Sequence, residues 1–216
     1  MIREFAANDF YYLVFAARWT VALSLVSILG GSLIGVVVMG LRVVPFAPAK
    51  ALAIGYIQAI QGTPLLGQLF IIYFGLGVFG YDVSAWVAAG VAFSLYSGAF
   101  LAEIWRGCVQ AIPKTQWEAS ASIGLGFLEQ LVYVIIPQAV RISIPPTIGF
   151  LVHLVKNTSL ASIIGFIELT RAGQIINAVT FRPMTVYLVV AAAYFCICFT
   201  LAQLSLKLER RLRVAR

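Results

Sequence analysis

The feature that most constrains this chain is a series of five apolar stretches, each long enough to cross a lipid bilayer. A helix needs about 20 apolar residues to span the hydrocarbon core. Of the 216 residues, 62% are hydrophobic and 11% are charged, whereas a soluble domain carries roughly 25% charged residues. The sequence therefore predicts an all-α polytopic membrane protein that forms a single domain over residues 1–216. The predicted spans are Trp19–Leu41, Leu52–Phe79, Trp86–Trp105, Ile144–Gly165 and Thr185–Leu206.

The second stretch is longer than a span requires and carries helix breakers near its centre. These are Gly62, Thr63 and Pro64. A proline removes one helical hydrogen bond and kinks the helix. In a membrane, such a break persists only where protein or a water-filled cavity satisfies the freed backbone groups. Two interpretations stay open, a stretch that lines a substrate path and a kink that only serves packing.

Basic residues are distributed unevenly between the two sides of the predicted spans. The positive-inside rule places the richer side in the cytoplasm, so the N-terminus is predicted outside and the C-terminus inside. A nucleic-acid partner is not expected, because the basic residues flank apolar spans and form no face with stacking aromatics. Those on the richer side are Arg42, Lys50, Arg106, Lys114, Arg141, Lys207, Arg210, Arg211, Arg213 and Arg216, and those on the other side are Arg3, Arg18, Arg171 and Arg182.

The longest segment between spans, about residues 106–143, is predicted to form a helical elbow on the cytoplasmic side. Thr115 is expected to cap a short helix over Gln116–Ile123, with Glu118 completing a capping box. Gly124 then breaks the helix, and a second helix over Phe127–Ile135 is expected to end before Pro137. Such an elbow suits a partner's groove, although a loop that only covers the bundle would show the same pattern.

Several motifs resemble those of ABC importer permeases, in particular the branch that imports polar amino acids. The elbow resembles the family's loop E-A-A-x-x-x-G-(x)9-I-x-L-P, with serine, valine and isoleucine in place of alanine, isoleucine and leucine. The resemblance covers nearly the whole chain, from the first span to the last. The matching segments are Gln61–Leu66, Ala102–Gly107, Ile112–Gln116, Glu118–Ser120 with Gly124, Val134–Ala139 and Lys156–Leu160.

The resemblance implies a type I importer fold in the bacterial inner membrane, with five spans and a helix–glycine–helix coupling loop. It implies a second copy or a related permease, two ABC ATPase subunits that bind ATP and Mg²⁺, and a periplasmic amino-acid-binding protein. The chain lacks the G-x-x-x-x-G-K-[ST] motif, so no cofactor and no ATPase activity of its own are expected. The residues expected to couple to the ATPase are Glu118, Ala119, Ser120, Gly124, Phe127, Leu128 and Pro137.

The fourth span contains the most polar intramembrane segment, consisting of His153, Lys156, Asn157, Thr158 and Ser159. Polar groups at this depth usually face a cavity, so these residues are expected to line the substrate path together with Gly62, Thr63 and Pro64. Lys156 could instead extend to the outer interface. Relatives that carry cationic amino acids can have an acid at the position of Asn157. The sequence therefore favours a neutral or acidic amino acid as the substrate.

Glu103 and Arg106, three residues apart at the end of the third span, are expected to form an ion pair. Glu103 is interpreted as the only acidic residue near a span. The segment Gly165–Thr180, which includes Glu168, is expected to form an amphipathic helix on the outer surface. This helix either contacts the binding protein or only caps the bundle.

Small residues in the first span indicate a close helix contact. Gly31 and Gly35 are four residues apart, and Gly30 precedes them. Small residues at this spacing let two helices approach closely. The sequence leaves two partners open, another helix of the same chain and a second subunit.

Two other classes of membrane protein fit the sequence less well. An ion-coupled secondary amino-acid transporter would show inverted repeats and intramembrane acids, and the sequence shows neither. An intramembrane hydrolase would need a nucleophile facing its base, but His153 and Ser159 point apart on one helix. No catalytic residue and no metal site are therefore predicted. Cys108, Cys196 and Cys198 match no zinc-ligand spacing.

Overall fold

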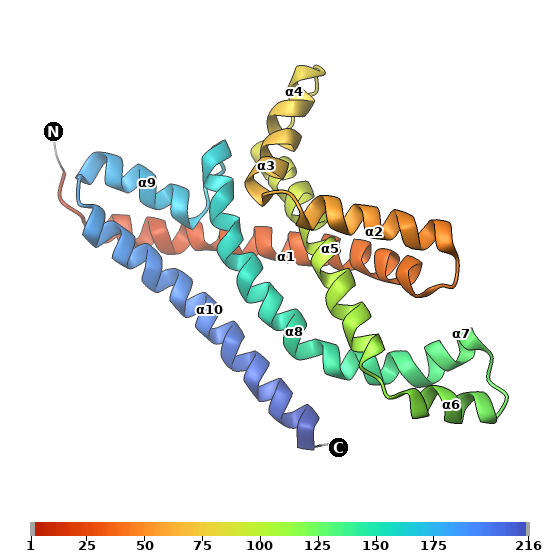
Figure 1. The fold of residues 1–216 in the computed structure, drawn as a ribbon. Coiled ribbons are helices and arrows are strands. Elements are labelled where there is room, and N and C mark those ends of the chain that lie inside the picture. Colours follow the sequence, from red (N-terminus) through yellow and green to blue (C-terminus); the bar gives the residue numbers. More distant parts are fainter. Residues whose placement is uncertain (1–2, 215–216) are drawn as a thin grey trace.

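The computed structural model describes residues 3–214, with side chains up to residue 210, and every regular element in this range is helical (Figure 1). The side chains of Arg211 and Arg213, and all of Arg216, lie outside the described residues. The α-helices are α1 (Ala7–Val43), α2 (Ala47–Gln61), α3 (Leu65–Phe70), α4 (Leu76–Val78), α5 (Ala85–Gln110), α6 (Lys114–Ser122), α7 (Phe127–Glu129), α8 (Ile136–Asn157), α9 (Leu169–Thr180) and α10 (Pro183–Val214). Wide π-helical turns occupy Ile71–Gly75 and Gln130–Ile135, and a 3-10 helix follows α8 over Thr158–Ile164.

Four helical stretches within the described chain are long and apolar enough to cross a membrane. They are Ala7–Val43, Ala85–Gln110, Phe127–Ile164 and Pro183–Arg210. A fifth candidate consists of α2 followed by α3–α4, which meet at a bend of 98°. The all-helical membrane fold is thus confirmed. The first helix begins 12 residues before the predicted span at Trp19, because the preceding turns are also apolar and favour helix.

Large apolar side chains cover much of the outer surface of the long helices. On α1, Leu29 is 65% exposed and Leu33 is 74% exposed, and Phe195 on α10 is 64% exposed. In water such a surface would drive association. In a bilayer it costs little, because lipid tails are as apolar as leucine.

The main core lies between α5, the middle of α1 and the two helical segments α3 and α8. Phe93 and Ala92 on α5, Leu69 on α3 and Leu154 on α8 are fully buried together. Small residues allow α1 and α5 to approach closely, because Gly31 lies directly against Ser97. The glycine stripe therefore packs inside the chain.

The segment between α5 and α8 forms a helical elbow, defined here as residues 111–129 (Figure 1). The bundle end that carries it is called the elbow end, and the end that carries α9 is called the far end. The short helix predicted at Gln116–Ile123 is confirmed as α6. The predicted Thr115 cap is wrong, because α6 begins at Lys114 after Pro113, whose fixed backbone suits the position before a helix.

The predicted end of the second elbow helix before Pro137 is also wrong. Helical structure continues from Phe127 through Pro137 into the fourth span. The wide turn Gln130–Ile135 directly precedes the proline. Such a π-bulge relaxes the hydrogen-bond ladder, so the missing N–H of Pro137 does not end the helix. The fourth candidate span is therefore one bent helix that reaches directly into the elbow.

Candidate functional site

The break in the second candidate span lies between α2 and α3, as predicted, and its backbone is held by one glutamine. The Gln68 side-chain amide donates to the backbone oxygens of Ile60 at 2.7 Å and Thr63 at 3.2 Å, and to Thr63 Oγ1 at 2.9 Å. The Thr63 hydroxyl in turn donates to the Ala59 carbonyl oxygen at 2.7 Å. A buried glutamine thus satisfies the groups that the break frees, which the membrane requires.

Gln68 was not among the predicted site residues, although a signal for it existed. It lies four residues after Pro64, in an otherwise apolar helix, where a polar side chain needs a partner. Gly62, Thr63 and Pro64 themselves are exposed on the surface of the single chain.

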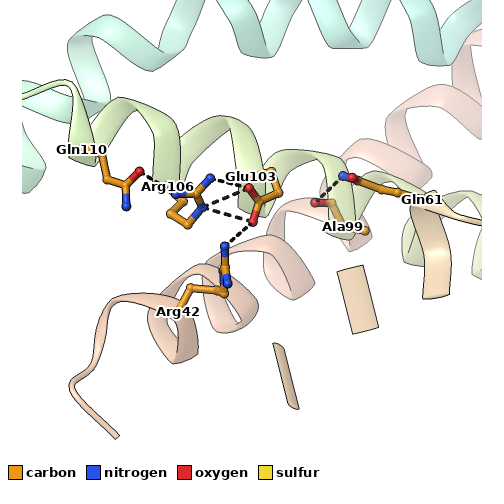
Figure 2. Close-up of polar contacts among 6 residues, drawn as sticks. All are labelled: Arg42, Gln61, Ala99, Glu103, Arg106 and Gln110. Carbon is orange, nitrogen blue, oxygen red and sulfur yellow. Dashed lines mark hydrogen bonds and ion pairs between the residues drawn. The ribbon is translucent and has the colours of Figure 1, made fainter. Parts of the chain in front are cut away.

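Replacing Gln68 by leucine is expected to lower the free energy of unfolding by about 2 kcal/mol, because buried carbonyl oxygens lose their donor. Gln61→Leu is the matched control. The Gln61 amide reaches only the Ala99 carbonyl oxygen, at 3.5 Å (Figure 2). Thermal melting of both variants in detergent measures the difference. Equal destabilisation would show that Gln68 does not hold the break.

An ionic cluster joins α1 to α5 at the elbow end. The predicted pair is confirmed, since the Arg106 guanidinium contacts the Glu103 carboxylate at 2.6 Å. Arg42, at the end of α1, contacts the same carboxylate at 3.2 Å. Figure 2 shows both arginines pointing at Glu103 from different helices. The cluster fixes the end of α5, from which the elbow continues.

The polar segment at the end of α8 divides between two faces. His153 and Lys156 are exposed, whereas Thr158 is fully buried. The Asn157 side chain interacts with the hydroxyl of Tyr96 on α5, and Ser159 donates to the Lys156 carbonyl oxygen at 2.7 Å. The segment therefore does not face one cavity of the single chain. Its exposed face, with His153 and Lys156, lies on the surface of the single chain.

The break and the polar segment flank the same core. Leu65 and Leu69, just after the break, pack in one cluster with Ala161 and Ile164, just after the polar segment. The candidate path residues of the two spans thus come from neighbouring elements.

The elbow presents an apolar tip. Ile123 is 77% exposed, Leu128 is 65% exposed and Phe127 stacks on Trp117 at 6.0 Å. Glu118 and Ala119 are exposed on α6, and Pro137 is exposed at the start of α8. The exposed side chains of Ile123, Phe127 and Leu128 are available to a partner.

Two predicted elbow residues have internal roles. Ser120 is buried, and its hydroxyl donates to the Trp117 carbonyl oxygen at 2.9 Å. Gly124 adopts φ +86°, a left-handed conformation, and its N–H donates to the Ala121 carbonyl oxygen at 2.9 Å. Ser120 and Gly124 thus shape the elbow.

The interpretation of Glu103 as the only acid near a span is wrong. Glu168 has no exposed surface and lies at the start of α9, against α1 and α10. Sequence reasoning placed it on an outer surface, because α9 has a clear polar face. That face begins only after Glu168, whose carboxyl group caps the helix from inside the bundle.

The fold and these features define a class, a membrane-embedded transport component with a broken span, a polar intramembrane segment and a protruding elbow. The chain belongs to the family described as "Binding-protein-dependent transport system inner membrane component", whose model matches residues 27–214. It is an ABC transporter permease of the inner membrane.

Two relatives have names that refer to amino-acid transport. The chain is 36% identical over 208 residues to a probable amino-acid ABC transporter permease protein, YckA of Bacillus subtilis, with 96% of this chain and 92% of the relative covered. It is also 36% identical over 204 residues to the glutamine transport system permease protein GlnP of Escherichia coli K12, with 94% and 93% covered.

Solved structures confirm the type I importer fold. A crystal structure of an amino acid ABC transporter with histidines superposes with a TM-score of 0.91 at 35% identity, covering 98% of this chain and 100% of that one. The inward-facing MetNI methionine ABC transporter superposes with a TM-score of 0.81 at 20% identity, covering 98% and 100%. The second match, at its low identity, shows the fold alone.

Proposed function

We propose that the chain is the permease subunit of an ATP-driven importer that moves a polar amino acid from a periplasmic binding protein across the inner membrane. The observation that carries this proposal is the elbow. The exposed apolar surface of the long helices suits lipid. Ile123, Phe127 and Leu128 are exposed instead on the short helical elbow, where the fourth candidate span begins. An apolar tip beside the exposed Glu118 suits a groove on a partner protein.

ATP and Mg²⁺ act in this proposal on partner ATPase subunits, which receive the elbow. The elbow end is cytoplasmic, as the distribution of basic residues favours, with the N-terminus outside. Closure of the ATPase dimer would move the elbow as a rigid body and switch the bundle between outward and inward access. The bent helix that runs from Phe127 to Ile164 gives this motion a direct route into the membrane.

The substrate path is proposed to run along Gly62, Thr63, Pro64 and the segment His153–Ser159, completed by a second permease subunit. The support is the exposure of Gly62, Thr63, Pro64, His153 and Lys156 on the single chain, which is costly in lipid for Lys156 and His153. A second copy or a related permease facing this surface would enclose these groups. The names of two relatives refer to the transport of amino acids and of glutamine, which supports an amino acid as the substrate.

Uptake by cells that express the complete transporter tests the proposal. We expect ATP-dependent uptake, with neutral or acidic amino acids preferred over lysine and arginine by about tenfold, since Asn157 offers no carboxylate to a cationic side chain. Competition against labelled glutamine and lysine measures the preference. Preferred lysine uptake would contradict the substrate class. Uptake that follows an ion gradient and needs no ATP would contradict the importer.

A further inference from the structure

Glu168 is a buried acidic residue that the proposed transport mechanism does not use. It has no exposed surface, and its neighbours on α1 and α10 are in van der Waals contact with α9. Burying a carboxyl group costs free energy unless hydrogen bonds compensate for the lost water. Burial raises the pKa of the Glu168 carboxyl, and the donors around it oppose that rise. An apolar residue would fill such a position at lower cost.

Four donors from three helices converge on this carboxyl group. The backbone N–H groups of Thr170 and Arg171 donate to it at 2.9 Å each, which caps α9. The Tyr194 hydroxyl on α10 donates at 2.7 Å, and the Thr20 hydroxyl on α1 donates at 3.3 Å. One side chain thus fixes the start of α9 to both neighbouring helices.

The Tyr194 side chain also lies beside the polar segment of the fourth span. The Tyr194 hydroxyl interacts with Thr158, which is fully buried, and lies 3.0 Å from Thr170 Oγ1. Thr158 is the buried member of the candidate path segment, and Asn157 and Ser159 flank it. The start of α9 and the segment at the end of α8 therefore share one buried tyrosine.

We propose that Glu168 is a positioning residue of the transport cycle, which locks α9 to α1 and α10 and makes α9 and the segment 156–159 move as one body. The inference rests on the proposed function, in which a binding protein docks at the far end, where α9 lies. Docking on α9 would then act on the polar segment through Glu168 and Tyr194. The exposed face of α9, with Ile175 and Val179, remains available for docking.

The first test measures the lock itself by hydrogen exchange of the full chain in lipid nanodiscs. Tyr194→Phe removes one hydroxyl and keeps the ring. We expect amides of both α9 and the segment 156–164 to exchange about tenfold faster, because a buried hydrogen bond to a carboxyl group is lost. Tyr187→Phe, on the same helix with a side chain 40% exposed, is the control and should leave exchange unchanged. Unchanged exchange in either segment of Tyr194→Phe would overturn the proposal.

The second test measures coupling in the complex of the chain with its ATPase and its binding protein, supplied with a mixture of the twenty common amino acids. Tyr194→Phe should keep basal ATP hydrolysis within about twofold, whereas stimulation by the binding protein should fall about fivefold. Unchanged stimulation, or an equal loss of both rates, would overturn the proposal. If the wild-type complex shows no stimulation, the proposed function fails, and the exchange experiment still decides whether Glu168 locks α9.

Discussion

Replacing Gly124 by valine is expected to reduce amino-acid uptake to about a tenth, while ATP hydrolysis by the assembled complex stays near the wild-type rate. The expected loss is one of coupling. The elbow would still be present, but its two helices would meet at a different angle, so that ATPase closure would no longer move the spans.

The physical reason is the backbone conformation at Gly124. Its φ of +86° is unfavourable for a side chain with a Cβ, most of all a β-branched one. No atom lies within 4 Å of the position that a Cβ would take, so crowding plays no part. The left-handed turn lets the N–H of Leu125 donate to the Ser120 carbonyl oxygen at 3.2 Å, which closes the end of α6.

Two further variants separate conformation from side-chain size. Asparagine tolerates the left-handed region better than valine, so Gly124→Asn should retain most uptake. Gly126 lies two residues away with φ −69°, which any residue adopts. Gly126→Ala should therefore transport normally. Uptake and ATP hydrolysis measured in the same proteoliposomes test all three variants. Wild-type uptake by Gly124→Val would remove the elbow turn from the coupling mechanism.

The sequence was sufficient for features that depend on local patterns. Apolar length predicted the helical spans, Pro64 predicted the break, and Gly124 predicted the elbow turn. Each of these follows from one residue type or from a run of residues, so no tertiary information is needed. The pair Glu103–Arg106 was equally accessible, because three residues along a helix place two side chains on one face.

The sequence was insufficient where a polar side chain acts across helices. Gln68 donates to backbone oxygens at the break, and Glu168 accepts from backbone N–H groups at the start of α9. Tyr194 reaches Glu168 from α10, and Tyr96 reaches Asn157 from α5. Their partners are set by packing, which periodicity does not encode. The helix across Pro137 was missed for a related reason, since the wide turn before it depends on the bent route of the whole fourth span.

The largest effect on stability is expected at Gly31. A Cβ added there would lie 2.3 Å from the Ser97 Cβ and 3.1 Å from the Gly98 backbone nitrogen. Neither atom can move without the backbone of α5, so α1 and α5 must separate along their contact. We expect Gly31→Ala to lower the free energy of unfolding by about 3 kcal/mol, at the upper end of typical overpacking costs.

The matched control for Gly31→Ala lies on the same helix. A Cβ at Gly40 would meet no atom within 4 Å, and alanine is a better helix former than glycine by about 1 kcal/mol. Gly40→Ala should therefore be neutral or stabilising. Melting of the purified chain in detergent measures both variants, and for a chain of this size Gly31→Ala should melt about 6 to 12 °C lower.

The same experiment decides between the two partners that the sequence leaves open for the glycine stripe. If Gly31 served contact between subunits, Gly31→Ala would weaken dimers and leave the melting of the isolated chain unchanged. The structure places Gly31, Gly35 and Gly98 between α1 and α5 of one chain, since Gly98 lies against Ile34 and Gly35 against Leu101. Because lipid supplies no hydrophobic force between helices, close van der Waals packing of this kind must stabilise the pair. Loss of stability without loss of association is therefore the expected result, and the reverse would place the stripe between subunits.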